Sequence, residues 1–518
     1  MYPSSHDHAC SAHGMHRCCG CSGDALVSLT RRGFLEGTVL GTTALTGLSW
    51  PALAATRSDE LPAPPPRRPL VVKPILIYSV PVRRAQTSWR NWGGIETEGD
   101  ANGECARIGT ELTQVQTKAD FPITVLPVAA VKSLKAVKGL ADVAGADVLL
   151  VYAAGGEVNG IEALGKDVIF FLRHRSGPVS LWYEIISPRY LRQHTDDPKV
   201  AAIDADDVVV DSLDELTWRL RALCGLANTR GARIVAVGGP GAWAHGKEVV
   251  DMVKSKWKLD IRDLPYEELG SLIKMARADK EAVALAKRRA DAYLKQPGTS
   301  LETGRPFVEN AMLLDQIFRA VMADQKCRMI TINQCMGTIM PLSETSACMS
   351  LSTLNDDGYL AFCESDFVVI PSGMLMAGIS GHPMFLNDPT FPHEGVITLA
   401  HCTAPRKLDG KTVEPVRILT HFESDYGAAP KVEMRIGQKV TNIIPDFAGK
   451  RWVGFTGEIV DHPFLPICRS QIDVKFTGDS RKLAERMPGF HWMTIYGDYL
   501  REAGYALKKI PIALEHLS

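Results

Sequence analysis

Short apolar runs alternate with helical patterns over the first half of the chain. The runs are apolar at almost every position, which is typical of parallel strands covered on both faces. The predicted strands are residues 70–78, 123–126, 147–152, 167–172, 179–184, 208–210 and 233–237. The clearest helical patterns between them cover residues 105–118 and 212–227. This alternation predicts doubly wound α/β architecture, and its length indicates two such units.

The pattern changes in the second half. Two long helical segments, 266–295 and 306–324, are followed from about residue 358 by short β-like runs between Gly, Pro, Asn and Asp. These runs are residues 367–370, 396–400, 416–422, 431–436, 452–459 and 471–476. The predicted fold class is therefore α/β, with two doubly wound (Rossmann-like) parallel-sheet units followed by a C-terminal, mainly antiparallel β-barrel-like domain.

The N-terminal segment indicates export. Thr30-Arg31-Arg32-Gly33-Phe34-Leu35 resembles the twin-arginine signal, whose pathway moves folded proteins, and Ala52-Leu53-Ala54 has the small residues of a cleavage site. The alternative is an ordinary Arg-Arg pair before a short hydrophobic helix. We expect cleavage after Ala54, the export machinery as a partner and a periplasmic or extracytoplasmic location. The predicted divisions are a signal peptide at 1–54, a proline-rich linker at 55–69, α/β units at 70–176 and 177–357, and a β-rich domain at 358–518.

Composition narrows the function classes. The formal net charge of -1 argues against a nucleic-acid binder. After the leader no apolar run reaches the roughly 18 residues of a membrane span, so none is expected. Four of the 12 cysteines lie in a Cys/His-rich tract of the leader, which can bind metal but would be removed with it. The other cysteines form no C-x-x-C pair, and we expect buried free thiols.

Two local features carry candidate chemistry. Gly238-Gly239-Pro240-Gly241 follows a predicted strand and is either an anion-cradling loop or, as we favour, a tight turn. Glu364 and Asp366 are two residues apart and project to the same side if the segment is extended. Such a pair is often a solvated edge. At the junction of two domains it is also suited to hold a divalent cation or to divide acid and base roles.

Histidines beside polar partners concentrate downstream of that pair. They are His382, His393, His401, His421, His462 and His491. Any one of them is more often a surface or packing residue than a functional one. Together with the carboxylates they predict a metal site with oxygen and nitrogen ligands.

Six segments in this region carry a family resemblance. They are Cys363-Glu364-Ser365-Asp366, Ser380-Gly381-His382-Pro383-Met384-Phe385-Leu386-Asn387-Asp388, His401-Cys402, His421-Phe422-Glu423-Ser424, Gly437-Gln438-Lys439-Val440-Thr441 and His491-Trp492-Met493-Thr494-Ile495-Tyr496-Gly497-Asp498. In order and spacing they resemble the L-fucose isomerase and L-arabinose isomerase-like sugar isomerases, from about residue 330 to 510. Over the two α/β units the resemblance is architectural.

The resemblance implies a metal-dependent aldose–ketose isomerase that commonly uses manganese and moves a proton between C1 and C2 through an enediol. Asp366 falls on the family's metal-binding and proton-transferring carboxylate, His491 on its C-terminal ligand, and Glu364 on the other acidic position. Each of the three is therefore a candidate metal ligand, and the two carboxylates are candidate catalytic groups. His401, His421 and Tyr496 are the expected sugar contacts. The family commonly forms trimers or hexamers, so we expect a homo-oligomer.

One family feature is missing. Counting back from Leu354-Asn355-Asp356, Leu351 stands where the family has a further catalytic and metal-binding glutamate, and Glu344 is the nearest acid. Either another carboxylate such as Glu364 compensates, or isomerisation is lost and sugar binding kept. The main alternative is thus a non-catalytic periplasmic sugar-binding or sensing protein, and a third is a metal-dependent hydrolase. The sequence does not identify the sugar.

Overall fold

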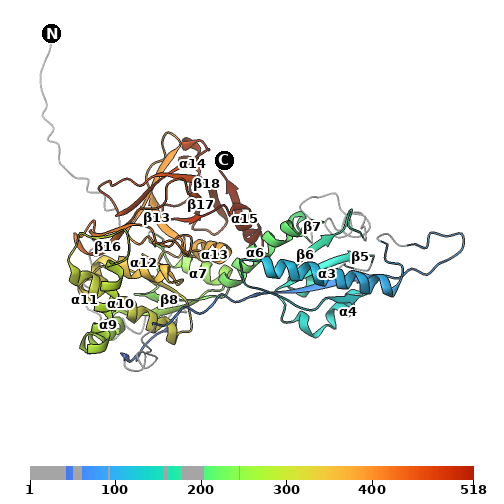
Figure 1. Cartoon of the computed structure of the whole chain (residues 1–518), viewed down its shortest axis with the longest axis horizontal. Helices are drawn as coiled ribbons and strands as arrows, with labels where there is room; N and C mark the ends of the chain where they lie inside the picture. Colours follow the sequence, from blue (N-terminus) through green and yellow to red (C-terminus); the bar gives the residue numbers. More distant parts are fainter. Residues whose placement is uncertain are drawn as a thin grey trace, which may run out of the picture.

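Two parallel sheets and one closed antiparallel barrel form the core of the computed structural model, which describes residues 43–50, 61–90, 94–155, 158, 160–177, 203–243 and 245–517. The predicted fold class is therefore confirmed. In Figure 1 the first α/β unit stands to one side, and the second unit and the barrel lie against each other. The twin-arginine pair and the predicted strand 179–184 lie outside the described residues.

The first sheet is centred on β2 (Leu70–Tyr78) and has the strand order β3-β2-β5-β6-β7, with β4 also paired to β2. All of these pairings are parallel. The other elements are α3 (Glu98–Lys118), β3 (Ile123–Val125), β4 (Ala129–Val131), α4 (Leu134–Lys138), β5 (Val148–Ala154), β6 (Asp167–Leu172) and β7 (Val208–Val210). After β2 the chain adds β3 and β4 on one side of it. It then crosses to β5 on the other side, where β6 and β7 follow. The last strand, β7, joins this sheet although it lies beyond residue 176.

The second sheet has the parallel order β1-β9-β8-β11-β12. Its elements are β1 (Thr43–Ala44), β8 (Arg233–Val237), α7 (Lys247–Trp257), β9 (Asp260–Leu264), α8 (Tyr266–Ala278), α9 (Lys280–Leu294), α10 (Arg305–Asp324), β11 (Met329–Ile332), α11 (Met340–Ser343), α12 (Cys348–Asp356) and β12 (Leu360–Phe362). Its winding direction reverses between β8 and β11. Ligands of open α/β sheets bind at such a switch point, beyond the carboxyl ends of the strands.

The predicted helix at 266–295 is in fact two helices. The chain leaves helical geometry at Asp279, whose carboxylate accepts hydrogen bonds from the backbone N–H groups of Glu281 and Ala282. An aspartate that satisfies these free donors caps a new helix instead of continuing the old one.

The barrel closes because β17 pairs with both β18 and β20, giving the ring β17-β20-β13-β14-β19-β18. Its strands are β13 (Phe385–Pro389), β14 (Val396–His401), β17 (Lys439–Ile444), β18 (Arg451–Asp461), β19 (Ser470–Phe476) and β20 (Trp492–Tyr496). A further strand, β21 (Ala513–His516), runs parallel to β18, and α14 (Ser480–Arg486) lies before β20. A separate small sheet contains β10 (Thr299–Leu301), β15 (Val416–His421) and β16 (Tyr426–Val432).

Two of the predicted β runs need correction. Residues 367–370 form no strand, because the chain turns there into α13 (Ile370–Ser380). The apolar side chain of Phe367 is buried in that turn. The run at 431–436 overlaps only the last two residues of β16. Apolar residues alone therefore did not separate a buried turn from a strand.

The fully buried helix α13 joins the second unit to the barrel and packs against α6 (Leu213–Thr229). The two helices cross at glycines: a Cβ on Gly378 would lie 3.0 Å from the Cα of Gly225. α15 (Leu500–Lys508) packs on α6 as well. Within the described part of the chain, no helix is long and apolar enough to cross a membrane.

Candidate metal centre

The candidate site lies where the carboxyl end of the second sheet meets one end of the barrel. From the sheet comes the turn at residues 363–366, directly after β12. From the barrel come Asp388 on β13, His401 at the end of β14 and His491 just before β20. Register brings them together, because Asn387 pairs with Trp492 and Asp388 with Ala400.

Glu364 and Asp366 would project to the same side if this segment were extended. The segment forms a tight turn instead. Glu364 and Ser365 have φ values of 64° and 49°, a left-handed conformation that costs energy for residues other than glycine. The glycine loop after β8 holds this turn: Gly241 N–H donates to Ser365 O at 3.1 Å, and Ser365 Oγ donates to Gly239 O at 2.9 Å. The loop at 238–241 is thus a tight turn that supports the site.

His491 is the centre of the cluster and has a carboxylate at each ring nitrogen. Its Nδ1 lies 2.6 Å from Asp366 Oδ2, and its Nε2 lies 3.2 Å from Glu364 Oε2. The same Nε2 is 3.2 Å from Asp388 Oδ1. Asp366 and Glu364 therefore act on opposite sides of one imidazole.

His401 completes the cluster from the neighbouring strand. Its Nδ1 is 3.0 Å from Thr403 Oγ1, so its Nε2 faces inward, 3.6 Å from Glu364 Oε1. One ligand atom each from Asp388, His401 and His491 lies within 4.8 Å of the others. Cys363, Glu364 and His401 form a second, overlapping group at the same limit.

These residues fit a divalent metal. Asp388 Oδ1 and His401 Nε2 are buried and accept or donate no hydrogen bond, which is costly for polar atoms unless a ligand satisfies them. Two imidazoles with carboxylates suit manganese, iron, cobalt or zinc. Asp366, bound to the far nitrogen of His491, has the position of a carboxylate that orients a histidine ligand.

Burial and neighbouring charges shift the pKa values of the residues in the cluster. Burial alone would lower the pKa of His491, but the charge of Asp388 and hydrogen bonds to Asp366 and Glu364 raise it well above its ordinary value. Burial is likewise outweighed at His401, whose pKa is raised by the neighbouring carboxylates of Glu364 and Asp388. Against burial, the two neighbouring imidazoles hold the pKa of Glu364 well below its usual range. Burial raises the pKa of Asp388 to about 6, despite the two imidazoles.

Two of the expected sugar contacts are hydrogen-bonded to side chains outside the cluster. His421 is buried at the end of β15, where its Nδ1 is 3.1 Å from Ser424 Oγ and its ring contacts the Cys402 thiol. Tyr496 lies five residues after His491, about 17 Å further along the strand. Its hydroxyl donates to Glu414 at 2.8 Å.

Leu351 stands at the place of the missing glutamate, and Glu344 is the nearest acid. Neither supplies a carboxylate to the cluster. Leu351 is fully buried in α12, and Glu344 forms a 2.6 Å ion pair with Arg277. The third carboxylate of the site is Asp388, which lies in one of the family-like segments but was not among the expected ligands. Its side chain keeps 33% of its surface exposed, against 14% for Glu364, so it is the more accessible of the two.

Aromatic rings beside the cluster were also missed. Phe490 lies 4.1 Å from the His491 ring and 4.1 Å from Trp243, measured between ring centroids. Both are unusually exposed for their type, Trp243 by 45% and Phe490 by 38%. Exposed aromatic surface next to converging polar groups is typical of a ligand site. Their positions were the signal in the sequence. Trp243 comes just after the glycine loop, and Phe490 directly precedes His491.

The thiols near the site are not joined by disulfides. Cys363 Sγ is 3.9 Å from Cys335 Sγ, and Cys348, Cys402 and Cys468 pack together nearby. None of the eight cysteines in the described residues forms a disulfide.

Comparisons with known proteins add no relative. No protein-family model matches the chain, and no curated protein matches it.

Proposed function

We propose that this protein is a metal-dependent aldose–ketose isomerase of the L-fucose and L-arabinose isomerase-like type, with manganese as its cation. The observation that carries the proposal is the convergence of His401, His491, Glu364 and Asp388, two of whose ligand atoms are buried without hydrogen bonds. The exposed pair Trp243 and Phe490 supports a sugar as the ligand, because an aromatic face packs against the apolar face of a pyranose or open-chain sugar.

The four cluster residues would hold the metal, and Asp366 would orient His491 through Nδ1. When bound, a divalent cation stabilises negative charge on the sugar oxygens. The left-handed turn at Glu364 and the hydrogen bond between Thr403 and His401 fix these ligands before substrate arrives. Such preorganisation reduces the cost of assembling the site.

Asp388 is the candidate proton carrier. Its side chain is the more exposed of the two carboxylates on the Nε2 side of His491, so it is the one that a substrate carbon can reach. It would remove the C2 proton of the open-chain aldose and return it to C1, while a hydroxyl proton passes from O2 to O1. The product is the ketose, and the carboxylate ends as it began. Asp388 thereby replaces the carboxylate lost at Leu351.

The same proposal includes the setting of the enzyme. Export by the twin-arginine machinery would carry a folded, metal-loaded protein to the periplasm or another extracytoplasmic location. A homo-oligomer, trimeric or hexameric, is proposed on the resemblance alone. Isomerisation outside the cytoplasm would then act on free sugars before uptake.

The direct test uses purified protein, with and without Mn²⁺, on a panel of free aldoses, with ketose formation followed by NMR. Asp388→Asn should reduce turnover by roughly 10²–10⁴-fold. Asp498→Asn is the matched control, because Asp498 belongs to the same motif as His491 but pairs only with Lys439 at the surface, at 2.8 Å. It should keep full activity.

Three results would redirect the proposal. No turnover on any aldose together with no bound metal would overturn it. Thermal stabilisation by a sugar without turnover would favour the non-catalytic sugar-binding protein. Activity on glycosides or esters instead of free sugars would favour the hydrolase.

A further inference from the structure

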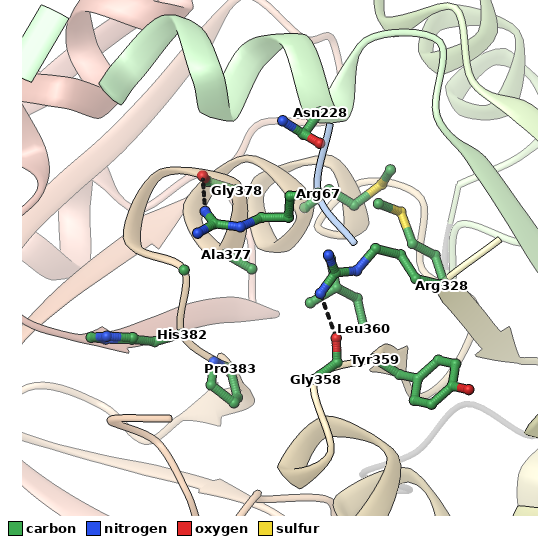
Figure 2. A pocket seen from close by; sticks show the side chains of 13 residues that line it. Arg67, Asn228, Arg328, Gly358, Tyr359, Leu360, Ala377, Gly378, His382 and Pro383 are labelled. Atoms are coloured by element: carbon green, nitrogen blue, oxygen red, sulfur yellow. Dashed lines mark hydrogen bonds between the residues drawn. The ribbon is translucent and has the colours of Figure 1, made fainter. Parts of the chain in front are cut away.

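A second pocket lies away from the metal centre, where the proline-rich linker crosses the edge of the second sheet. It encloses about 50 Å³ and is lined by Arg67 of the linker, Arg328 before β11, and Gly378 of α13 (Figure 2). Asn228 of α6 and His382 also line it. No acidic side chain is among its lining residues.

Neither of these two arginines has a counter-ion among the described residues. Arg67 Nη1 donates to the carbonyl of Gly378 at 2.9 Å, and Arg328 Nη2 donates to the carbonyl of Gly358. Neither forms an ion pair with a carboxylate of the described residues. Burial and the charge of Arg67 lower the pKa of Arg328 to about 10.

Polar atoms in this region also lack partners. Arg328 Nε is buried without a hydrogen bond, and so is His382 Nδ1. Burying an unpaired guanidinium is expensive, and proteins normally offset the cost with a carboxylate or a bound anion. The described residues that line the pocket provide no carboxylate, so a bound anion is a source of the missing charge.

We propose that this pocket binds a small tetrahedral oxyanion of the phosphate or sulfate type. Guanidinium groups match the geometry of such oxygens. A cavity needs about 10–15 Å³ to hold one water, so 50 Å³ has room for a small ion. This size favours the free inorganic ion over a phosphorylated sugar.

The ion would also fasten the linker to the folded body. Arg67 comes from the linker, and the carbonyl of Pro62 in the same segment accepts a 2.6 Å hydrogen bond from Tyr359. A bound anion between Arg67 and Arg328 would convert mutual repulsion into attraction. The segment that follows the predicted leader would then be held against the second sheet.

The test measures thermal unfolding with inorganic phosphate or sulfate against chloride at equal ionic strength, with EDTA present so that a metal site does not contribute. We expect a saturable rise in Tm of about 1–3 °C at tenfold excess over Kd. Arg328→Gln and Arg67→Gln should lose it. Arg481→Gln should keep it, because Arg481 is 86% exposed and pairs only with Glu485.

Limited trypsin digestion gives a second readout that does not depend on stability. Phosphate should slow cleavage between Arg67 and Arg68 in the wild type and not in Arg328→Gln, which retains that cleavage site. An unsaturable shift, or one equal in wild type and Arg328→Gln, would show general salt stabilisation and overturn the proposal. A stronger effect of glucose 6-phosphate than of phosphate would overturn the free-ion assignment.

Discussion

The two sides of the His491 ring separate two kinds of carboxylate. Glu364 and Asp388 share the Nε2 side with the open cluster, and Asp366 alone occupies Nδ1. Asp366→Asn should therefore weaken Mn²⁺ binding about 10–100-fold without abolishing it, because an orienting partner is lost but the ligands remain. Isothermal titration calorimetry of the metal-depleted protein measures this directly.

Comparison with Asp388→Asn decides whether Asp366 orients His491 or is itself a metal ligand. On the geometry of the cluster this variant should lose more affinity than Asp366→Asn does. If Asp366→Asn instead binds no metal and Asp388→Asn binds normally, then Asp366 is itself the ligand, as the family resemblance implies. The ring would then use Nδ1 toward the metal.

Metal binding should depend on pH, because raised pKa values leave extra protons on His491 and His401 in the metal-free protein. Only a neutral ring nitrogen binds a cation, so the ion must displace those protons. The apparent Kd should weaken as pH falls, by up to about tenfold per pH unit for each displaced proton. Calorimetry in two buffers of different ionisation enthalpy should detect proton release near neutral pH.

His393→Asn serves as the control for that experiment, because His393 is exposed on a loop away from the cluster. It should leave both the pH dependence and the proton release unchanged. Binding with no net proton release at any pH would contradict the imidazolium–carboxylate description of the metal-free site.

The sequence revealed only part of this site. Glu364, Asp366 and His491 were found because two lie in a short motif and the third in a distinctive segment. The roles within the cluster depend on which ring nitrogen each carboxylate meets, and that follows from a left-handed turn no spacing predicts. Asp388 reaches His491 only through the pairing of β13 with β20. Long-range register of this kind is not visible in one chain.

At the level of elements, the crossing of α6 and α13 leaves little room for a side chain between the two helices. A Cβ on Gly378 would lie 3.0 Å from both the Cα and the O of Gly225, so the helices would have to separate. Gly378→Ala should lower the free energy of unfolding by roughly 1–3 kcal/mol, the usual cost of overpacking. Denaturant unfolding provides the measurement.

Gly103→Ala is the matched control, since Gly103 lies in the middle of α3 and a Cβ there meets nothing within 4 Å. The same substitution should raise stability there by about 0.5–1 kcal/mol through helix propensity. Opposite signs for the two variants would support the close helix crossing. Equal effects would contradict it.

Local patterns predicted most elements but not how they assemble. The apolar runs at β2, β5 and β8 correspond to strands because parallel strands covered on both faces leave a local signature. Closure of the barrel rests on the pairing of β17 with β18 and β20, which is a long-range fact. The break at Asp279 had a local signal, a capping aspartate, that helical periodicity obscured.

At the scale of the whole molecule, part of the predicted leader is also part of the fold. Thr43 and Ala44 form β1 at the edge of the second sheet, paired with Arg262 and Asp263 of β9. Trp50 is only 3% exposed, and its Nε1 donates to Asp279 at 3.1 Å. Residues before the predicted cleavage site thus cover an edge and fill an apolar slot.

Cleavage after Ala54 should therefore make the exported form less stable than its precursor. Removing β1 leaves β9 as an open edge, and losing buried Leu45 and Trp50 should cost roughly 2–5 kcal/mol. The measurement compares denaturant unfolding of the full chain with a chain that starts at residue 55. Trp50→Ala in the full chain should reproduce much of the loss, and Trp89→Ala, outside the apolar core, should not. Mass spectrometry of the exported protein gives the decisive result: an N-terminus at residue 55 supports a removable leader. An exported chain that keeps residues 43–50 would instead make them a permanent strand of the second sheet.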